Sequence, residues 1–200
     1  LETGLEAYQV FDVRNQLGAA GTVANNLCAM GVSVKALTMR GDDANGYVMA
    51  QLMQQQTINQ GGMVVDQRIF TPTYIKPMMY EVNNEVHELN RMDIKNRQGV
   101  IVEIETQLIE KLISLAFEAD AVLVTDQVQE PGCGVVTNGL RVALSNLGKT
   151  RPELPIWVDS RERGEFFSNT SLKTNLSEAR KALMLTDEET LSADEAAVRL

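Results

Sequence analysis

The chain has 200 residues, of which 44% are hydrophobic, and its formal net charge is −9 at pH 7. This length suits one globular domain with a sizeable core, and the acidic balance argues against a protein that grips nucleic acid or an anionic membrane. No apolar run approaches the roughly 20 residues of a transmembrane helix. The composition therefore predicts a cytoplasmic protein that binds neither nucleic acid nor membranes.

The two cysteines, Cys28 and Cys133, lack the spacing of metal ligands, and Cys28 lies in an apolar run. We predict reduced thiols without a disulfide. The chain shows no signal peptide and no initiator methionine, so we expect it to begin within a gene or after processing.

Small residues open the first element, because the segment 18–21 reads GAAG. Val23, Leu27 and Met30 follow at helical spacing, and Gly31 ends the run. Two interpretations remain open for the small residues: the backbone approaches a ligand closely, or the helix packs tightly on a sheet. A strand over 32–39 and a capped helix over 41–56 follow.

The segment 62–94 has a different character. Its residues alternate with period two around Asn83 and Asn84, which is typical of a hairpin turn. Pro77 indicates an edge or a bulge. We predict a small antiparallel flap outside the main body.

The remainder alternates between helices and strands. Helices are predicted over 103–120, with one apolar stripe, and over 135–149. Apolar runs that end in a polar residue, as buried parallel strands do, occupy 121–126 and 155–160. A short strand and a helix over 171–185 and a last helix capped by Ser192 complete the pattern. This alternation predicts an α/β fold with a mostly parallel sheet.

Ligands of such sheets bind beyond the carboxyl ends of the strands. Polar groups follow three predicted strands, at 125–126, at 159–161 and at 174–178. Asp126 could instead be a helix cap or turn residue, and Asp159 could be a turn residue paired with Arg161. Three such ends together favour a binding site.

The order of these segments resembles the ribokinase-like (PfkB) carbohydrate kinases, most closely the heptose 7-phosphate kinases. GAAGTVANNLCAMG (18–31) is similar to the family's Gly-rich loop and helix, and GDDANG (41–46) to its GxDxxG turn. Residues 71–93 resemble the lid strands and end in the Arg-x-Asp motif of the heptose kinases. LVTDQ (123–127) and the segment 155–178 resemble the family's substrate-side Asp and its NxxE region.

The resemblance implies a ribokinase-like fold with helices on both faces of the sheet, and transfer of a phosphoryl group from ATP, with magnesium, to a sugar or sugar phosphate. It implies that the chain is a partial domain over 1–200, with lid strands near 5–17 and 62–92. We also expect a homodimer in which two copies pair through the lid strands. The substrate-binding residues that the resemblance implies are Gly18, Ala19, Thr22, Asn26, Arg91 and Asp126, and the cofactor-binding residues are Asp159, Arg161, Asn175 and Glu178. Asn175 and Glu178 would act on magnesium through water.

Other interpretations stay open for several of these residues. Arg91 could form a surface salt bridge with Asp93 or Glu88, and Lys76 could be an exposed strand lysine. Asn175 and Glu178 could simply begin a helix. The single histidine, His87, lies in the hairpin, and the expected chemistry does not need it.

The sequence also departs from the family. Ala19, Thr22, Met78 and Gln127 replace a Gly, an Asn, an Arg and a Tyr that the family commonly has at these positions. The Gly-Ala-Gly-Asp motif that carries the family's catalytic base is absent from residues 1–200, and the family's first strand is also missing. We therefore expect a fragment of a longer protein that is inactive alone. The alternative function is a non-catalytic protein that binds a sugar or a partner chain.

A dinucleotide-binding domain is disfavoured, because the Gly-rich loop lacks GxGxxG spacing.

Overall fold

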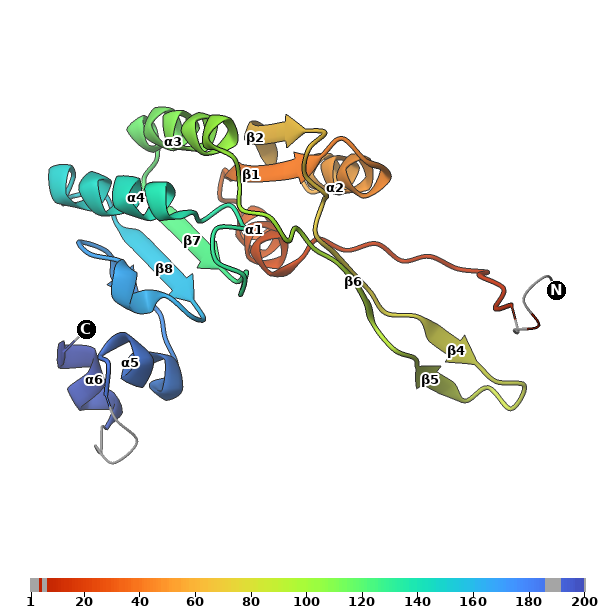
Figure 1. Ribbon diagram of the computed structural model, residues 1–200. Helices are drawn as coiled ribbons and strands as arrows, with labels where there is room; N and C mark the ends of the chain where they lie inside the picture. The colour runs from red at the N-terminus through yellow and green to blue at the C-terminus, as the bar shows by residue number, and fades with distance from the viewer. Residues whose placement is uncertain (1–3, 5–6, 186–191, 200) are drawn as a thin grey trace.

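The computed structural model describes residue 4 and residues 7–185 and 192–199. Two parallel sheets form its centre (Figure 1). In the first, β1 (Lys35–Gly41) pairs with β2 (Asn59–Asp66). In the second, β8 (Ile156–Ser160) lies between β7 (Val122–Asp126) and β9 (Ser171–Leu172). The predicted α/β class with parallel strands is confirmed.

One apolar core joins the two sheets. Helix α3 (Val102–Phe117) contacts β1, β2 and α4 (Asn138–Thr150). Its stripe at spacing i, i+4, i+8 and i+12 is buried, as the helical period requires. The core cluster draws on both sheets and both helices, with Met39, Val64, Ile104, Leu108, Leu112, Val124, Val136, Leu140, Leu144, Ile156, Val158 and Phe167 as its buried members.

The remaining helices are less deeply packed. Helix α2 (Ala44–Gln55) contacts β1 and β2, whereas α1 (Ala19–Ala29) has no buried residue. After a 3-10 turn over Gly164–Phe166, α5 (Leu176–Ala182) and α6 (Ala193–Arg199) form a small cluster around Ala179 and Ala196. Ser192 caps α6 as predicted, because its hydroxyl accepts from the amide of Glu195.

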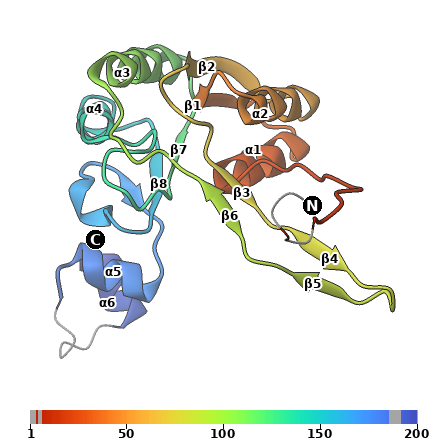
Figure 2. The same ribbon diagram turned by 45° about the vertical axis from the view of Figure 1, so that its right-hand side comes forward.

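The lid is a long antiparallel arm that projects from the body (Figures 1 and 2). Its base pairs β3 (Thr73–Ile75) with β6 (Met92–Ile94), and its tip pairs β4 (Met78–Tyr80) with β5 (Val86–Glu88). Pro77 separates β3 from β4, where a missing N–H breaks the ladder. Asn84 has φ 66° at the predicted hairpin turn.

The lid is shorter than the predicted ranges. Residues 62–66 belong to β2 of the parallel sheet, because Gly62 packs against Ala36 of β1 and Leu115 of α3. Residues 7–18, within or next to the expected lid strand at 5–17, form no strand. This segment contacts the lid through a side chain instead of strand pairing. Phe11 packs edge-on against Tyr80, with 5.3 Å between the ring centroids.

Within the described residues, one face of the β7–β8 sheet carries exposed apolar side chains. Alternate residues of these strands face α3 and α4, and on the opposite face Leu123 and Trp157 are each 49% exposed. The expectation of helices on the faces of the sheet is met at the first sheet, which α2 and α3 both contact.

Substitution of the core residue Leu108 by Ala should lower the free energy of unfolding by about 2–5 kcal/mol, because the stripe of α3 loses its contacts to both sheets and a cavity remains. Urea denaturation measures this loss. Ile113→Ala in the same helix is the matched control, since Ile113 is 61% exposed. An equal loss in both variants would contradict the central place of the α3 stripe.

Candidate functional site

The predicted polar strand ends meet at the carboxyl edge of the second sheet. The parallel register places Thr125 opposite Asp159 and Asp126 opposite Ser160. The Ser160 hydroxyl donates to Asp126 Oδ2 at 2.9 Å. The segment after β9 continues to the start of α5 at the same edge, because the amide of Lys173 donates to Val158 O.

Asp126 is enclosed rather than presented to solvent. Its side chain is 3% exposed and faces Arg141 of α4, with Nη1 at 3.7 Å, and Arg163 beyond β8, with Nη1 at 3.8 Å. Burial raises the pKa of the Asp126 carboxyl, while the Ser160 hydroxyl and the two guanidinium groups act in the opposite direction. The carboxylate is thus surrounded by protein groups, namely the Ser160 hydroxyl and the guanidinium groups of Arg141 and Arg163.

Asp159 lies on the more open face of β8. Its partner is Lys173, with Nζ at 3.0 Å from Oδ2, and not Arg161 as the alternative interpretation had it. The hydrogen bond to Asp159 and the charge of its carboxylate raise the pKa of Lys173. Arg161 is exposed, and its backbone N–H donates to Asp126 O, so its charge lies at the same edge.

Asn175 and Glu178 form a reciprocal capping box at the start of α5. Asn175 Oδ1 accepts from the amide of Glu178, and Glu178 Oε2 accepts from the amide of Asn175, both at 2.9 Å. The structure therefore gives these residues the helix-starting role of the alternative interpretation. The cap leaves the second carboxylate oxygen of Glu178 outside this pair of hydrogen bonds.

The small residues at 18–21 begin α1, which lies beside the base of the lid in both views (Figures 1 and 2). Gly18, Ala19, Thr22 and Asn26 are all exposed. A Cβ on Gly18 would meet no atom within 4 Å, so packing does not require a glycine there. The tight-packing interpretation therefore finds no support at Gly18. The other interpretation, in which a ligand approaches the backbone closely, stays a prediction.

The base of the lid carries a cluster of charges around Tyr74. Arg91 binds Asp93 with two hydrogen bonds, of 2.7 and 2.8 Å, and lies 4.6 Å from the Tyr74 ring centroid. Lys95 is 5.8 Å from the same centroid. The surface pairing of Arg91 with Asp93 is thus the observed arrangement, and Lys76 pairs with Glu88 at 3.5 Å.

The GDDANG turn (41–46) forms hydrogen bonds with the residue that precedes the lid. Asp43 Oδ1 accepts from Gly46 N at 2.7 Å, and its Oδ2 accepts from Thr71 N at 2.8 Å, directly before the lid. Thr71 in turn accepts from Gly41 N at 3.0 Å. A Cβ on Gly41 or Gly46 would collide with the backbone or side chains of this junction, which explains both glycines.

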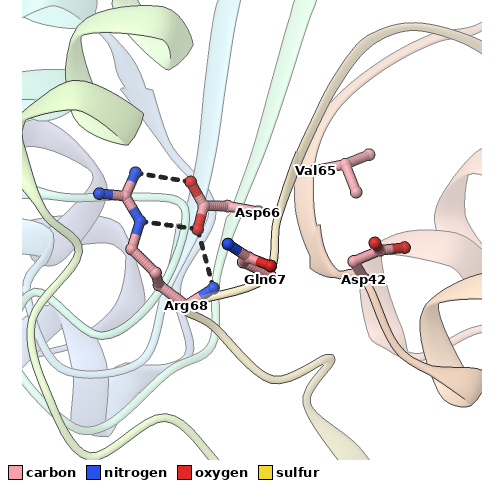
Figure 3. A pocket seen from close by; sticks show the side chains of 5 residues that line it. All are labelled: Asp42, Val65, Asp66, Gln67 and Arg68. Carbon is pink, nitrogen blue, oxygen red and sulfur yellow. Dashed lines mark hydrogen bonds and ion pairs between the residues drawn. The ribbon is translucent and has the colours of Figure 1, made fainter.

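A hollow lies at the carboxyl ends of β1 and β2 (Figure 3). It measures about 330 Å³ and is lined by Asp42, Val65, Asp66, Gln67 and Arg68. Arg68 and Asp66 bind each other in this hollow, and the Arg68 guanidinium lowers the pKa of Asp66 to about 2. These two charges neutralise each other, which leaves Asp42 as the further charged side chain of the lining.

Within the described residues, no three His, Cys, Asp or Glu side chains come together as a metal site. Both cysteines are free thiols, as predicted. No helix in the described ranges combines the length and apolar character that crossing a membrane would require.

The sequence did not reveal the partners of Asp126. Arg141 lies on the buried stripe of α4, three residues before Leu144 and seven before Gly148, and a charged residue at such a position was the available signal. Arg163 gave no signal beyond its place in a charged segment. Glu130, which pairs with Lys95 and Arg97, lies in a loop whose path the sequence could not supply.

The fold is shared with solved sugar kinases. A putative sugar kinase from Clostridium perfringens superposes with a TM-score of 0.61 at 14% identity, over 97% of this chain and 60% of that one. Phosphofructokinase-2 from Escherichia coli gives 0.59 at 18% identity, over 97% and 61%. These likenesses define the fold as ribokinase-like.

The sequence is similar to bifunctional protein HldE of two bacteria. Identity is 29% over 179 residues in Trichlorobacter lovleyi and 27% over 190 residues in Geobacter sulfurreducens. The aligned parts cover 87% and 92% of this chain but 34% and 37% of those proteins, so the chain spans about a third of their length. No family model matches the chain. The chain is thus similar in sequence to these proteins and shares the ribokinase-like fold of the solved sugar kinases.

Substitution of Asp43 by Asn should lower the free energy of unfolding at pH 7 by about 1–3 kcal/mol, because an amide nitrogen cannot accept from Thr71. Although burial acts upward, the amide donors of Thr71 and Gly46 hold the pKa of Asp43 below its ordinary value. Its stabilisation is therefore present above the unfolded pKa and is lost as the pH falls through the folded pKa.

The difference between wild type and Asp43→Asn should accordingly shrink below about pH 4. Urea denaturation at several pH values measures it. The exposed neighbour gives the control Asp42→Asn, which should change little. A difference that is independent of pH would exclude the carboxylate as the stabilising group.

Proposed function

We propose that the protein to which this chain belongs transfers the terminal phosphoryl group of ATP to a hydroxyl of a sugar or sugar phosphate. The observation that carries the proposal is the meeting of polar groups from β7, β8 and the start of α5 at one sheet edge, in a chain that shares the fold of sugar kinases. Heptose 7-phosphate is the finer proposal for the substrate, supported by the resemblance of Arg91 and Asp93 to the Arg-x-Asp motif.

The substrate side would consist of α1 and the lid. Exposed backbone and small side chains at Gly18 and Ala19 leave room for a hydroxylated ring, and Thr22 and Asn26 lie farther along the same helix. The Thr22 hydroxyl already donates to Gly18 O at 3.2 Å, so its oxygen remains an acceptor for a hydroxyl. Arg91 would exchange its bond with Asp93 for an anionic group of the substrate.

The nucleotide side would lie at Asp159, Arg161, Asn175 and Glu178. Bound ATP would supply the phosphoryl group, and magnesium would neutralise the negative charge of its oxygens. Magnesium keeps several waters and prefers oxygen ligands, and the described residues provide single carboxylates rather than a cluster. They therefore fit the ion only through water, with the second Glu178 oxygen as the acceptor, while Arg161 offers a cation to a phosphate.

A base for the sugar hydroxyl is the missing part. Within 1–200 no Gly-Ala-Gly-Asp motif occurs, and Asp126 is too enclosed to reach a substrate. We propose that the base comes from outside residues 1–200. A non-catalytic protein that binds a sugar is the alternative outcome of the experiment below.

The test is sugar-dependent ADP release by the complete gene product, with hexoses, pentoses and heptose 7-phosphate as acceptors. Arg91→Ala should raise the KM for a phosphorylated sugar roughly 10- to 100-fold, because a charge-assisted hydrogen bond is lost. Asn175→Ala should lower kcat. The 200-residue chain alone should release no ADP.

Matched controls exist for both variants. Arg68 binds Asp66 as Arg91 binds Asp93, with two side-chain hydrogen bonds across two positions, so Arg68→Ala should leave KM unchanged. Ser192 caps α6 as Asn175 caps α5, so Ser192→Ala should leave kcat unchanged. No turnover with any sugar, while a sugar still raises the Tm, would replace the kinase by a binding protein.

We further propose that two copies associate through the lid. The lid tip exposes apolar side chains, among them Val82 and Tyr80 at 103% and 53% exposure, beside two-stranded edges that lack further partners within the described residues. Exposed strand edges invite pairing with another chain.

Substitution of Val86 in β5 by Lys should convert the dimer to a monomer, because a charge replaces an apolar contact at the edge. Light scattering coupled to size exclusion measures the mass. Phe117→Lys is the control, since Phe117 is 83% exposed but lies at the end of α3. A monomeric wild type, or a Val86→Lys protein that stays dimeric, contradicts this arrangement.

A further inference from the structure

Three charged side chains are buried together beside the sheet edge. Asp126, Arg141 and Arg163 are 3%, 5% and 10% exposed. Buried ion pairs contribute little net stability, because desolvation offsets the attraction, and their usual benefit is a defined arrangement of the groups around them. The partners of the two arginines show which arrangement is defined here.

Both arginines hold backbone carbonyls of the loop between β7 and α4. Arg163 donates to Val128 O at 2.8 Å and also to Gln129 O, and Arg141 donates to Val136 O at 3.0 Å. Residues 127–137 form no helix or strand, so their carbonyls need such donors. The carboxylate of Asp126 lies within 4 Å of both guanidinium groups and attracts them.

The same loop holds the base of the lid. Glu130 accepts from Lys95 at 3.4 Å and from Arg97 at 3.1 Å, directly after β6. The amide of Val100 donates to Gly132 O at 2.8 Å. One continuous set of contacts therefore leads from Asp126 through Arg163 and the loop to the lid.

We infer that Asp126 is a positioning residue that fixes the lid through the loop at 127–134, and not a group that touches the substrate. Its carboxylate orients Arg163, Arg163 shapes the loop, and Glu130 Oε1 accepts from both Lys95 and Arg97, which follow β6. This reassigns Asp126 from the substrate contact that the sequence predicts.

The functional meaning rests on the proposed kinase activity, because a lid set at the right angle excludes water that would compete as the phosphoryl acceptor. The structural coupling itself needs no ligand. It can therefore be measured on the complete gene product without any sugar or nucleotide.

Amide hydrogen exchange tests the coupling. Asp126→Asn leaves two buried guanidinium groups without a counter-charge, so exchange at 127–134 and at 94–100 should both become faster, on the order of tenfold. Exchange in α3 should stay unchanged. Arg163→Lys keeps a cation near Asp126 but loses the fork that holds two carbonyls, and it should act in the same way.

A double substitution tests whether the coupling between Asp126 and the lid passes through Glu130. Glu130→Gln should accelerate exchange at 94–97 but not at 127–129, and Asp126→Asn should add little at 94–97 in that background. Glu153→Gln is the control, because Glu153 forms an exposed pair with Arg151 and should change none of these rates.

Faster exchange in the loop with an unchanged lid would overturn the inference, and so would an equal acceleration in α3. If Asp126→Asn fails to fold, Arg163→Lys decides by the same criteria. Absence of ADP release would refute the proposed kinase while leaving these exchange rates as evidence on the coupling. Coupling absent in an active kinase would refute only the inference.

Discussion

The apolar stripe of α3 is the constraint on which the rest of the structure depends. β1 and β2 form one hydrogen-bonded sheet and β7, β8 and β9 another, so backbone pairing does not join them in the described residues. Ile104, Leu108 and Leu112 bury their side chains in a core that both sheets share. The lid leaves the body from the first sheet and the polar strand ends belong to the second, so this core sets their relative placement.

The carboxyl edge combines two kinds of charge. Asp159 and Arg161 are accessible and suit a role toward a ligand, whereas Asp126 is enclosed and acts on the protein itself. The alternation of a β-strand explains the difference, because neighbouring residues face opposite sides of the sheet. Asp126 faces the helices, while Asp159 is on the side with Trp157.

Sequence patterns predicted the elements of regular period well. The stripe of α3, the caps of α2 and α6 and the turn at Asn84 depend on near neighbours in the chain, and these are as predicted. The placement of 59–66 in the parallel sheet depends on packing against Ala36 and Leu115, which spacing does not reveal. Likewise, the contact of Arg163 with Asp126 joins residues from two segments of the chain that only the fold brings together.

The exposed face of the β7–β8 sheet carries an intrinsic fluorescent probe. Trp157 is the single tryptophan, and it lies half exposed two residues before Asp159 on the same side of β8. Indole emission moves to shorter wavelength when water is replaced by apolar surroundings. The fluorescence of the unmodified chain therefore reports directly whether anything covers this face, beside the sheet edge where the polar groups meet.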